Sequence, residues 1–381
     1  MIYLDACATT KPYEEVLRSF MTVNEQYYAN PNSPHKFAST VQTLIEASEE
    51  QFTSHFQTEH AYIYTSGATE SNNIALLGVA RRKKQFGQTI VASPIEHPSI
   101  LNPLKQLEKE GFNILWMNVD QYGCVDIDSF SNLMSTDVIL VTCMAINNIV
   151  GSIQPIKALG EMLQHYPKAH FHVDMTQAVG KMDLNMFELS KVDSFSFSAH
   201  KFHGIKGIGG LAIMNDNQLQ PIQYGGQQQT PIKSGTINVP AIVSMAKALN
   251  ESSKLKINRY NEFIQQKDGI HRYIQKNMPK IKLNSDIEHT VPHVINLSFK
   301  GVTGEVIVNA LNEYDIYVST TSACHSKHQS LNETLSHMNM SVEEIKGSIR
   351  ISFDDILSNE TLDEVLKALR EIYKSVEEVM N

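Results

Sequence analysis

One lysine of this chain stands among hydroxyl and imidazole side chains, a setting that suits covalent chemistry. Lys201 lies in the run 194–204, after an alternating strand-like stretch and before a glycine-rich turn. A lysine amine becomes a Schiff-base nucleophile when burial or neighbouring charges lower its pKa. A solvated surface charge explains this position poorly. We therefore predict that Lys201 is an amine held for covalent work at the end of a strand.

A carboxylate at the end of another apolar strand is the second candidate. Asp174 closes the run 170–174, and one helix and one further strand fit between it and Lys201. A buried aspartate needs a cation or several hydrogen-bond donors. Asp174 either caps the next helix or pairs with a protonated ring nitrogen, which would strengthen the electron sink of pyridoxal 5′-phosphate (PLP). In the second case both side chains reach the same edge of a sheet.

Two other strand ends carry residues that suit a cofactor. In the run 65–70, Gly67 leads into a helix that opens with Ala68 and Thr69, and backbone N–H groups at a helix start favour a phosphate. The alternative is an ordinary N-cap formed by Thr69 or by the serine before Gly67. His97 also follows a strand, where an imidazole can stack on a flat cofactor and move protons.

A cysteine and an arginine near the C-terminus complete the set. Cys324 stands among serine, histidine and lysine residues, a setting that exposes a thiol and favours its thiolate. Cys7, Cys124 and Cys143 lack such neighbours. Arg350 alternates with isoleucines in a strand-like run, and its guanidinium suits a bidentate grip on a carboxylate. The alternative places Arg350 on the solvent face of an edge strand.

The elements that must position these residues follow an α/β pattern. Short apolar runs alternate with helix-like segments such as 154–166, which indicates a mostly parallel sheet with ligands at the carboxyl ends of its strands. A long helix-like segment, 239–276, links this part to an α+β pattern near the C-terminus. The seven apolar runs are 61–64, 89–92, 114–117, 138–141, 170–173, 194–197 and 209–213.

Composition excludes several classes of protein. A length of 381 residues predicts about two domains, and 42% hydrophobic with 19% charged residues is typical of a globular chain. The net charge of −9 argues against direct nucleic-acid binding. No apolar run reaches the roughly 18 residues of a membrane span, so we expect a cytoplasmic protein. Four scattered cysteines without a Cys-x-x-Cys pair predict neither a disulfide framework nor a zinc site, and we expect no metal.

Taken together, these motifs resemble the cysteine desulfurases, PLP-dependent enzymes of the class V aminotransferase group, and specifically their longer-loop branch. The likeness extends over nearly the whole chain. It rests on five runs in the same order, 30–35, 65–73, 95–98, 198–204 and 322–324. The resemblance implies the PLP-dependent transferase fold type I, with a mostly parallel seven-stranded sheet in a large domain at 14–255. A smaller α+β domain, carrying the catalytic cysteine loop, would comprise 1–13 and 256–381.

The resemblance also implies roles for residues around PLP. Lys201 would be the Schiff-base lysine, Asp174 would bind the pyridine nitrogen, His97 would stack on the ring, and Gln177 would bond its phenolic oxygen. The residues implied to hold the phosphate are Gly67, Ala68, Thr69, Ser198 and His200. Thr236 would complete that phosphate site from the other subunit of a homodimer.

The implied substrate is L-cysteine, bound through its carboxylate by Asn147 and Arg350. Cys324 would attack the substrate sulfur, leaving alanine and a persulfide for sulfur acceptor proteins, such as an iron–sulfur scaffold or a tRNA thiolation enzyme. A selenocysteine lyase, another class V PLP enzyme and a degenerate PLP-binding scaffold are alternatives. The sequence departs from the family pattern at Ala29, Ile149, Ile205, Gln229 and Lys233.

Overall fold

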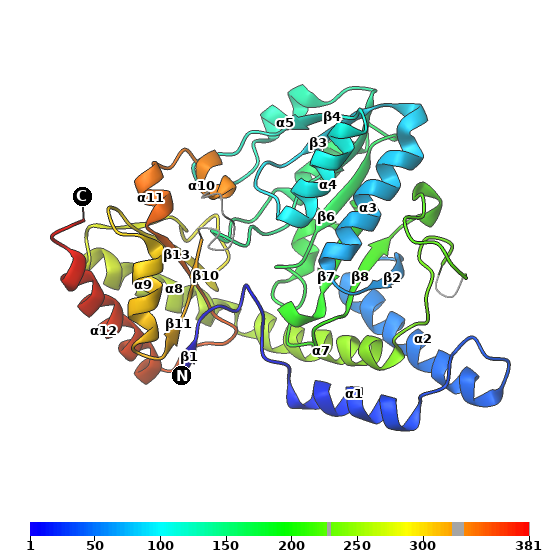
Figure 1. The fold of residues 1–381 in the computed structure, drawn as a ribbon, viewed down its shortest axis with the longest axis horizontal. Coiled ribbons are helices and arrows are strands. Elements are labelled where there is room, and N and C mark those ends of the chain that lie inside the picture. The colour runs from blue at the N-terminus through cyan, green and yellow to red at the C-terminus, as the bar shows by residue number, and fades with distance from the viewer. Residues whose placement is uncertain (227–229, 322–330, 381) are drawn as a thin grey trace.

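The chain folds into a larger and a smaller half, joined near the N-terminus and by a pair of helices (Figure 1). The computed structural model describes residues 1–226, 230–321 and 331–380. Strand β1 (Ile2–Tyr3) pairs in parallel with β11 (Ile316–Tyr317), so the chain begins in the smaller half. It then crosses to the larger half and enters α1 (Glu14–Gln26).

The larger half is built on one seven-stranded sheet in the order β2-β8-β7-β6-β5-β3-β4. Only β8 runs antiparallel to its neighbours, and the other strands share one direction. The predicted mostly parallel sheet is therefore confirmed. Its strands are β2 (Ala61–Thr65), β3 (Thr89–Ala92), β4 (Asn113–Trp116), β5 (Val138–Thr142), β6 (His170–Asp174), β7 (Ser194–Ser198) and β8 (Gly209–Ile213).

Helices cover both faces of this sheet. Successive side chains of a strand point to opposite faces, so Ile90 packs with the layer of α3 (Ala68–Lys83) and α4 (Pro98–Lys109), whereas Val91 packs with the opposite layer. In that layer α1 and α2 (Lys36–Phe56) contact the long α7 (Val239–Asn258). The remaining helices of this half are α5 (Ile127–Leu133) and α6 (Ile156–Leu163), with the 3-10 turns η1 (Lys84–Phe86), η2 (Leu184–Phe187), η3 (Leu189–Lys191), η4 (Ala199–Lys201) and η5 (Asp216–Gln218).

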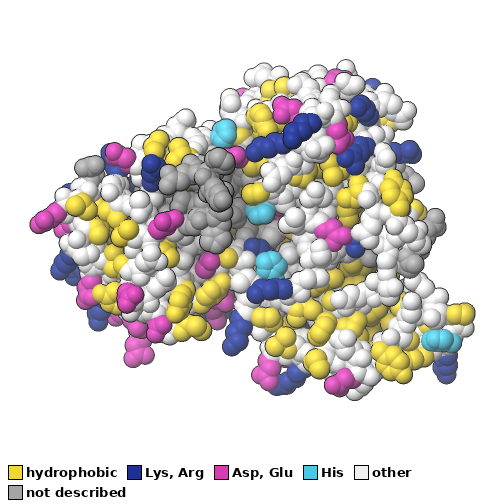
Figure 2. All heavy atoms as spheres, in the orientation of Figure 1, with side chains coloured by type: hydrophobic (Ala, Val, Ile, Leu, Met, Phe, Trp, Pro, Cys, Tyr) yellow, Lys and Arg dark blue, Asp and Glu magenta, His cyan; other side chains and the backbone are white. Residues whose placement is uncertain are grey.

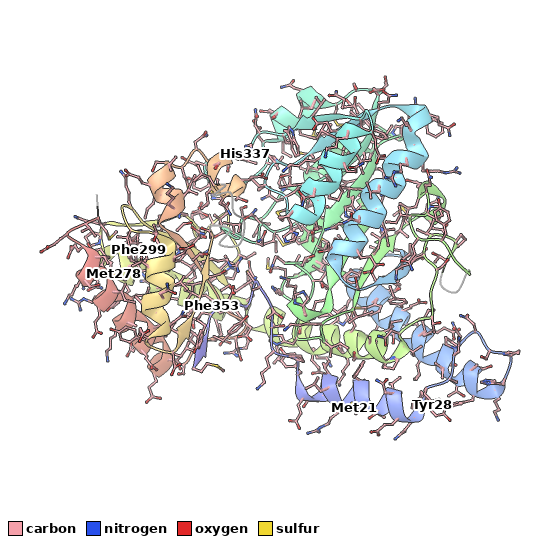
Figure 3. All side chains as sticks on the ribbon, viewed as in Figure 1. Met21, Tyr28, Met278, Phe299, His337 and Phe353 are labelled. Carbon is pink, nitrogen blue, oxygen red and sulfur yellow. The ribbon has the colours of Figure 1, made fainter. Side chains whose placement is uncertain are left out.

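The smaller half has its own antiparallel sheet in the order β12-β13-β10-β9 and its own apolar core. Met278, Phe299 and Phe353 belong to that core, and Figure 3 shows them together in this half. Its strands are β9 (Ile281–Leu283), β10 (Val294–Phe299), β12 (Ser319–Thr320) and β13 (Ser348–Ser352). Its helices are α8 (Tyr260–Asn277), α9 (Gly304–Asn312), α10 (Glu333–His337), α11 (Val342–Lys346) and α12 (Asn359–Val376).

The predicted segment 239–276 forms two helices that break at Arg259, whose φ is −107°. Helix α7 contacts α1 and α2 of the larger half, and α8 contacts β9 and α12 of the smaller half. The segment therefore links the two halves, as predicted. The domain boundary at 255/256 remains a prediction; it falls near the end of α7. No helix in the described part of the chain is both long and apolar enough to cross a membrane.

Candidate active site

Most of the predicted site residues line one cavity of about 580 Å³, where strands of the large sheet end beside the smaller half. Figure 2 shows histidine and basic side chains beside the hollow between the two halves. A cavity of this size is typical of a cofactor or small-molecule site. The predicted residues that line it are Gly67, Ala68, Thr69, His97, Asp174, Gln177, Ser198, His200, Lys201 and Arg350.

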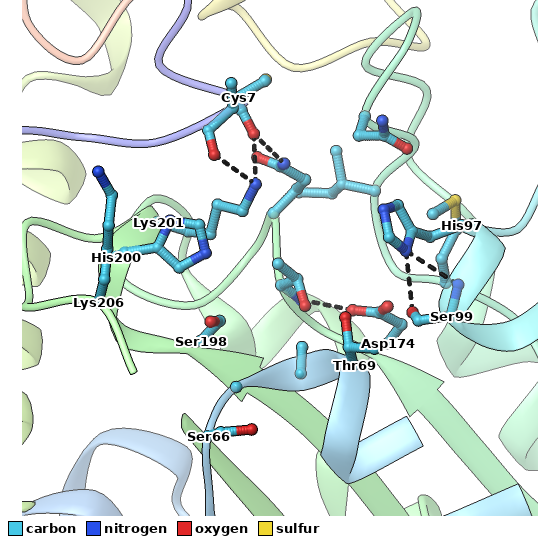
Figure 4. Close-up of a pocket in the computed structure, with 18 of the residues that line it drawn as sticks. Cys7, Ser66, Thr69, His97, Ser99, Asp174, Ser198, His200, Lys201 and Lys206 are labelled. Carbon is cyan, nitrogen blue, oxygen red and sulfur yellow. Dashed lines mark hydrogen bonds between the residues drawn. The ribbon is translucent and has the colours of Figure 1, made fainter. Parts of the chain in front are cut away.

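Lys201 reaches the cavity from the 3-10 turn η4 that follows β7. Its Nζ donates hydrogen bonds to the backbone carbonyls of Cys7 at 2.7 Å and Ala8 at 2.9 Å. Figure 4 shows Lys201 and His97 on opposite sides of the cavity, with Asp174 at its floor. Burial, with help from the charge of Arg350, lowers the pKa of Lys201 below its ordinary value. Because of the lowered pKa, a larger share of the amine is neutral and nucleophilic at neutral pH.

The loop between β2 and α3 forms a cradle for an anion. Gly67 precedes the first turn of α3 with φ at +152°, and no side chain caps that turn, so neither Thr69 nor Ser66 is the N-cap. A Cβ on Gly67 would stand only 3.2 Å from the Ser198 hydroxyl. The first N–H groups of the helix are thus left for a ligand, and a larger residue at position 67 would be strained by the positive φ and would crowd Ser198.

An ion pair braces this cradle from outside. The Glu70 carboxylate accepts the Ser66 N–H at 2.6 Å and pairs with Lys233 at 3.3 Å. The Ser66 hydrogen bond and the Lys233 charge outweigh desolvation and lower the Glu70 pKa. Lys233, one of the departures from the family pattern, therefore keeps a charged contact with Glu70 in the first turn of α3, beside the anion cradle.

Asp174 ends β6, and its carboxylate is held by two hydrogen-bond donors. Its carboxylate accepts from the Asn72 amide at 2.8 Å and from the Thr176 N–H at 2.9 Å. The Asn72 oxygen in turn faces His172 Nε2 at 3.0 Å. Burial lowers the pKa of His172 to about 3, so this ring is neutral and donates from Nε2 to Asn72. The bond from the Thr176 N–H forms the local turn that was the capping alternative for Asp174. Asp174 also lines the cavity, as the second alternative requires.

His97 and His200 are held as neutral rings beside the cavity. His97 Nδ1 accepts the Ser99 N–H at 3.1 Å, which leaves its proton on Nε2. Burial and the charge of Lys201 lower the pKa of His97, although the negative charge of Asp174 acts to raise it. Desolvation and the charges of Lys201 and Lys206 lower the pKa of His200 to about 4. Both imidazoles are therefore available as neutral hydrogen-bonding and stacking groups near pH 7.

Arg350 lies in β13, which is an interior strand of the small sheet. Its side chain is 7% exposed and pairs with Asp5 at 2.5 Å, and it donates to the Asn148 carbonyl at 2.8 Å. Within the described residues, its buried Nε has no acceptor. The alternative of a solvent-facing arginine on an edge strand is therefore wrong.

The structure places Asn147 outside the cavity, against the expectation for this residue. Its side-chain oxygen accepts from the N–H groups of Ile149 and Val150, and its amide donates to Ile95 O and Thr334 Oγ1. Asn147 is fully buried in this turn. Its neighbour Asn148 lines the cavity next to Arg350 instead, so Asn148 replaces Asn147 as the candidate for the substrate site.

The two remaining predicted residues are Thr236 and Cys324. Thr236 is exposed and lies outside this cavity; its predicted place is in the partner's site. Cys324, like Gln229, lies outside the described residues. Cys143 is buried just after β5, and burial raises the pKa of its thiol well above the ordinary value.

Several residues of the site were not found from the sequence. The carbonyls of Cys7 and Ala8 hold the lysine amine, and a backbone group leaves no signal in the residue types. Asn72 lies within the run 65–73, but nothing in that run indicates its contact with Asp174. Ser99 and Lys206 were not singled out, although both line the cavity.

The residues around the cavity fit PLP group by group. Lys201 supplies an amine, Asp174 an anion suited to a protonated ring nitrogen, and the start of α3 an anion cradle beside Ser198. A strand-end lysine and aspartate on a mostly parallel seven-stranded sheet, with a smaller α+β half beside them, define the PLP-dependent transferases of fold type I.

Comparisons with known proteins narrow this class. The family profile described as Aminotransferase class-V matches residues 2–365. A NifS/IcsS protein homolog of Lactobacillus delbrueckii subsp. bulgaricus is 39% identical over 379 residues, which cover 98% of this chain and 97% of that relative. Cysteine desulfurase IscS of Dictyoglomus turgidum is 36% identical over 377 residues, covering 98% and 95%. A solved NifS-like protein matches with a TM-score of 0.90 and 30% identity, covering 98% of this chain and 99% of that one.

The chain therefore belongs to the PLP-dependent class V aminotransferase family, in the group of the NifS- and IscS-type cysteine desulfurases.

The Glu70–Lys233 pair should contribute to cofactor affinity. Glu70→Ala removes the acceptor of the Ser66 N–H and the partner of Lys233, so the cradle loses its brace. We expect PLP affinity to fall about fivefold, the size of one partly exposed charge-assisted contact. Absorbance titration of the apoprotein with PLP measures it. The matched control is Glu110→Ala, which breaks the Arg81 pair outside the cavity; equal affinities in both variants would contradict the role of Glu70.

Proposed function

We propose that this protein is a cysteine desulfurase that converts L-cysteine to L-alanine and carries the sulfur as a persulfide on Cys324. The observation that carries the proposal is the convergence of Lys201, Asp174 and Arg350 on one cavity. The Cys324 thiolate attacks the substrate sulfur, and the carbon–sulfur bond breaks with its electron pair staying on the carbon skeleton. The sulfur remains on Cys324 as S–SH, and the carbon skeleton takes up a proton and leaves as alanine. Family membership supports the reaction class.

Arg350 and Asn148 are suited to bind the substrate carboxylate. Arg350 keeps its Nε donor without an acceptor in the described residues, and Asp5 and the Asn148 carbonyl fix the plane of its guanidinium. A guanidinium held in one plane grips a carboxylate with little loss of side-chain entropy. The substrate amine and thiol are then directed toward the opposite wall of the cavity.

Lys201 and His97 are suited to move protons. Lys201 has a lowered pKa and two carbonyls that keep its Nζ in the cavity. His97 is neutral and oriented through Nδ1 by Ser99. PLP, when bound, would supply the sink for the electron pair at the substrate carbon. The Asp174 carboxylate is suited to keep its ring nitrogen protonated, and the Gln177 amide is suited to donate to its phenolic oxygen.

We further propose a cytoplasmic homodimer in which Thr236 completes the phosphate site of the partner subunit. Thr236 is exposed and lies outside its own cavity. Met21 and Tyr28 are 54% and 76% exposed on the outer side of the larger half (Figure 3), and contact with a second subunit there would remove their apolar surface from water. Scattered cysteines without a Cys-x-x-Cys pair suit a reducing compartment.

The sulfur acceptor is proposed to be a protein, such as an iron–sulfur scaffold or a tRNA thiolation enzyme. A net charge of −9 disfavours direct contact with tRNA. A persulfide on a cysteine side chain passes to another thiol by exchange, which needs contact between two proteins and no free sulfide.

Cys324→Ser tests the proposal. The variant should bind PLP like the parent but form no persulfide on residue 324, and alanine release should fall at least about 100-fold, because the attacking thiolate is absent. Alanine is measured by chromatography, and persulfide by alkylation and mass spectrometry after incubation with L-cysteine. Cys124→Ser, at a half-buried thiol whose pKa burial raises to about 12, is the matched control. Undiminished persulfide in Cys324→Ser would refute the assignment.

A further inference from the structure

A second buried lysine lies behind the wall of the cavity. Lys181 follows β6 by one turn region, is 5% exposed, and does not line the cavity itself. Its Nζ donates to the side-chain oxygen of Gln177 at 2.7 Å. A buried ammonium is costly to desolvate, so its position calls for an explanation beyond packing.

The Lys181 contact fixes which way the Gln177 amide points. An ammonium has only donors, so the Gln177 atom facing it must be the carbonyl oxygen. The amide nitrogen therefore faces the other way, and Nε2 donates to the Cys7 carbonyl at 3.0 Å. Nε2 carries a second hydrogen, and Gln177 lines the cavity. That hydrogen is the donor that a ligand oxygen can use.

The same arrangement joins Lys181 to the reactive amine. The Cys7 carbonyl accepts from Gln177 Nε2 and from Lys201 Nζ at 2.7 Å. The charge of Lys181 also acts on His200, which lines the cavity, and helps to lower the pKa of that imidazole. The other charged and titratable groups that line the cavity are Cys7, His97, Asp174, His200, Lys201, Lys206 and Arg350.

We propose that Lys181 is a positioning residue: its ammonium locks the Gln177 amide with its N–H toward the phenolic oxygen of bound PLP and stabilises that oxygen as an anion. The inference rests on the proposed PLP site. A cation behind a neutral amide transmits its charge through an oriented dipole and does not need to touch the cofactor. Without the cation, the amide can turn its oxygen toward the ring and repel an anionic oxygen.

Lys181→Met, Lys181→Arg, Gln177→Ala and the double variant Lys181→Met/Gln177→Ala test this role in the PLP-loaded enzyme. The readouts are the pH midpoint of the near-visible absorbance band of bound PLP and the rate of PLP release to an apo-acceptor. Lys181→Met should raise the midpoint by about one pH unit, since losing a nearby cation makes the anionic form of the cofactor harder to reach, and should speed release several-fold. Lys181→Arg keeps the positive charge, so its pH midpoint and its rate of PLP release should both lie close to those of the parent.

The double variant separates positioning from general damage. If Lys181 acts through Gln177, the two single effects on the midpoint sum to more than the effect of the double variant. The matched control is Lys83→Met, which removes another buried lysine, donating to the Lys168 carbonyl outside the cavity, and should leave the midpoint unchanged. A parental midpoint in Lys181→Met, or fully additive effects, would overturn the inference alone. Absence of any absorbance band in the parent would overturn the proposed PLP site as well.

Discussion

Lys201→Ala should lose covalent PLP and nearly all alanine formation. In the proposed function the residue supplies both the amine that anchors the cofactor and a base for the reaction, and general base catalysis with covalent anchoring is worth about 10³-fold or more. The Ala8 carbonyl would lose its Nζ donor, and the Cys7 carbonyl would keep only the Gln177 amide as a donor. We expect a drop of at least about 10³-fold in kcat, measured as alanine released from L-cysteine.

The assignment can be located chemically in the parent enzyme. Borohydride reduction fixes PLP to its lysine, and peptide mass spectrometry then identifies the residue. The modification should fall on Lys201 and should be absent in Lys201→Ala. Lys206 also lines the cavity, so it is the competing amine. A reduced cofactor on Lys206, or near-parental turnover in Lys201→Ala, would contradict the role of Lys201.

The residues that could be found from the sequence are those at strand ends. Lys201 follows β7 and Asp174 ends β6, and these strands pair in parallel, so their chain positions place both residues at the same edge of the sheet. His97 and the Gly67 loop follow β3 and β2 in the same way. Strand runs are readable because a parallel sheet buried on both faces is apolar throughout. Fold and cofactor pocket were thus largely predictable from pattern and resemblance.

What could not be predicted depends on side-chain direction and on backbone groups. Asn147 and Asn148 are neighbours in one turn, and spacing alone cannot tell which of them faces the cavity. The turn decides, because Asn147 Oδ1 is used by two following N–H groups. The carbonyls that hold Lys201 come from residues near the N-terminus, and their approach depends on tertiary packing that residue types do not encode.

The contact of Asn72 with Asp174 likewise depends on packing between distant elements. Asn72 lies on α3 and Asp174 on β6, and their side chains meet because α3 packs across β6 and β7. No local spacing relates two residues so far apart in the chain. The Glu70–Lys233 pair has the same origin, because its two residues are also far apart in the chain and meet only through packing.

Asp174→Asn should be the second most damaging change at the site. A neutral amide cannot stabilise a protonated ring nitrogen, so the electron sink weakens when it is needed most. The new amide has only one acceptor oxygen for two donors, so either the Asn72 amide or the Thr176 N–H would face a second donor. Burial lowers the pKa of His172 to about 3, so this neutral ring cannot replace the negative charge that the substitution removes. We expect kcat to fall about 10²- to 10⁴-fold while PLP remains attached to Lys201.

A cofactor analogue distinguishes loss of charge from loss of shape. PLP methylated on its ring nitrogen carries a permanent positive charge, so Asp174→Asn loaded with it should recover part of the lost turnover. Asn72→Ala is the comparison variant, because it removes a neighbour of the Asp174 carboxylate and leaves the charge in place; its loss should be no more than about tenfold. If Asp174→Asn with ordinary PLP retained turnover within a few-fold of the parent, Asp174 would be the cap of a turn and not the partner of the ring nitrogen. The Thr176 N–H bond shows that Asp174 does form a turn. Only the comparison of charged and uncharged cofactor rings therefore separates the turn-capping role of Asp174 from its role as partner of the ring nitrogen.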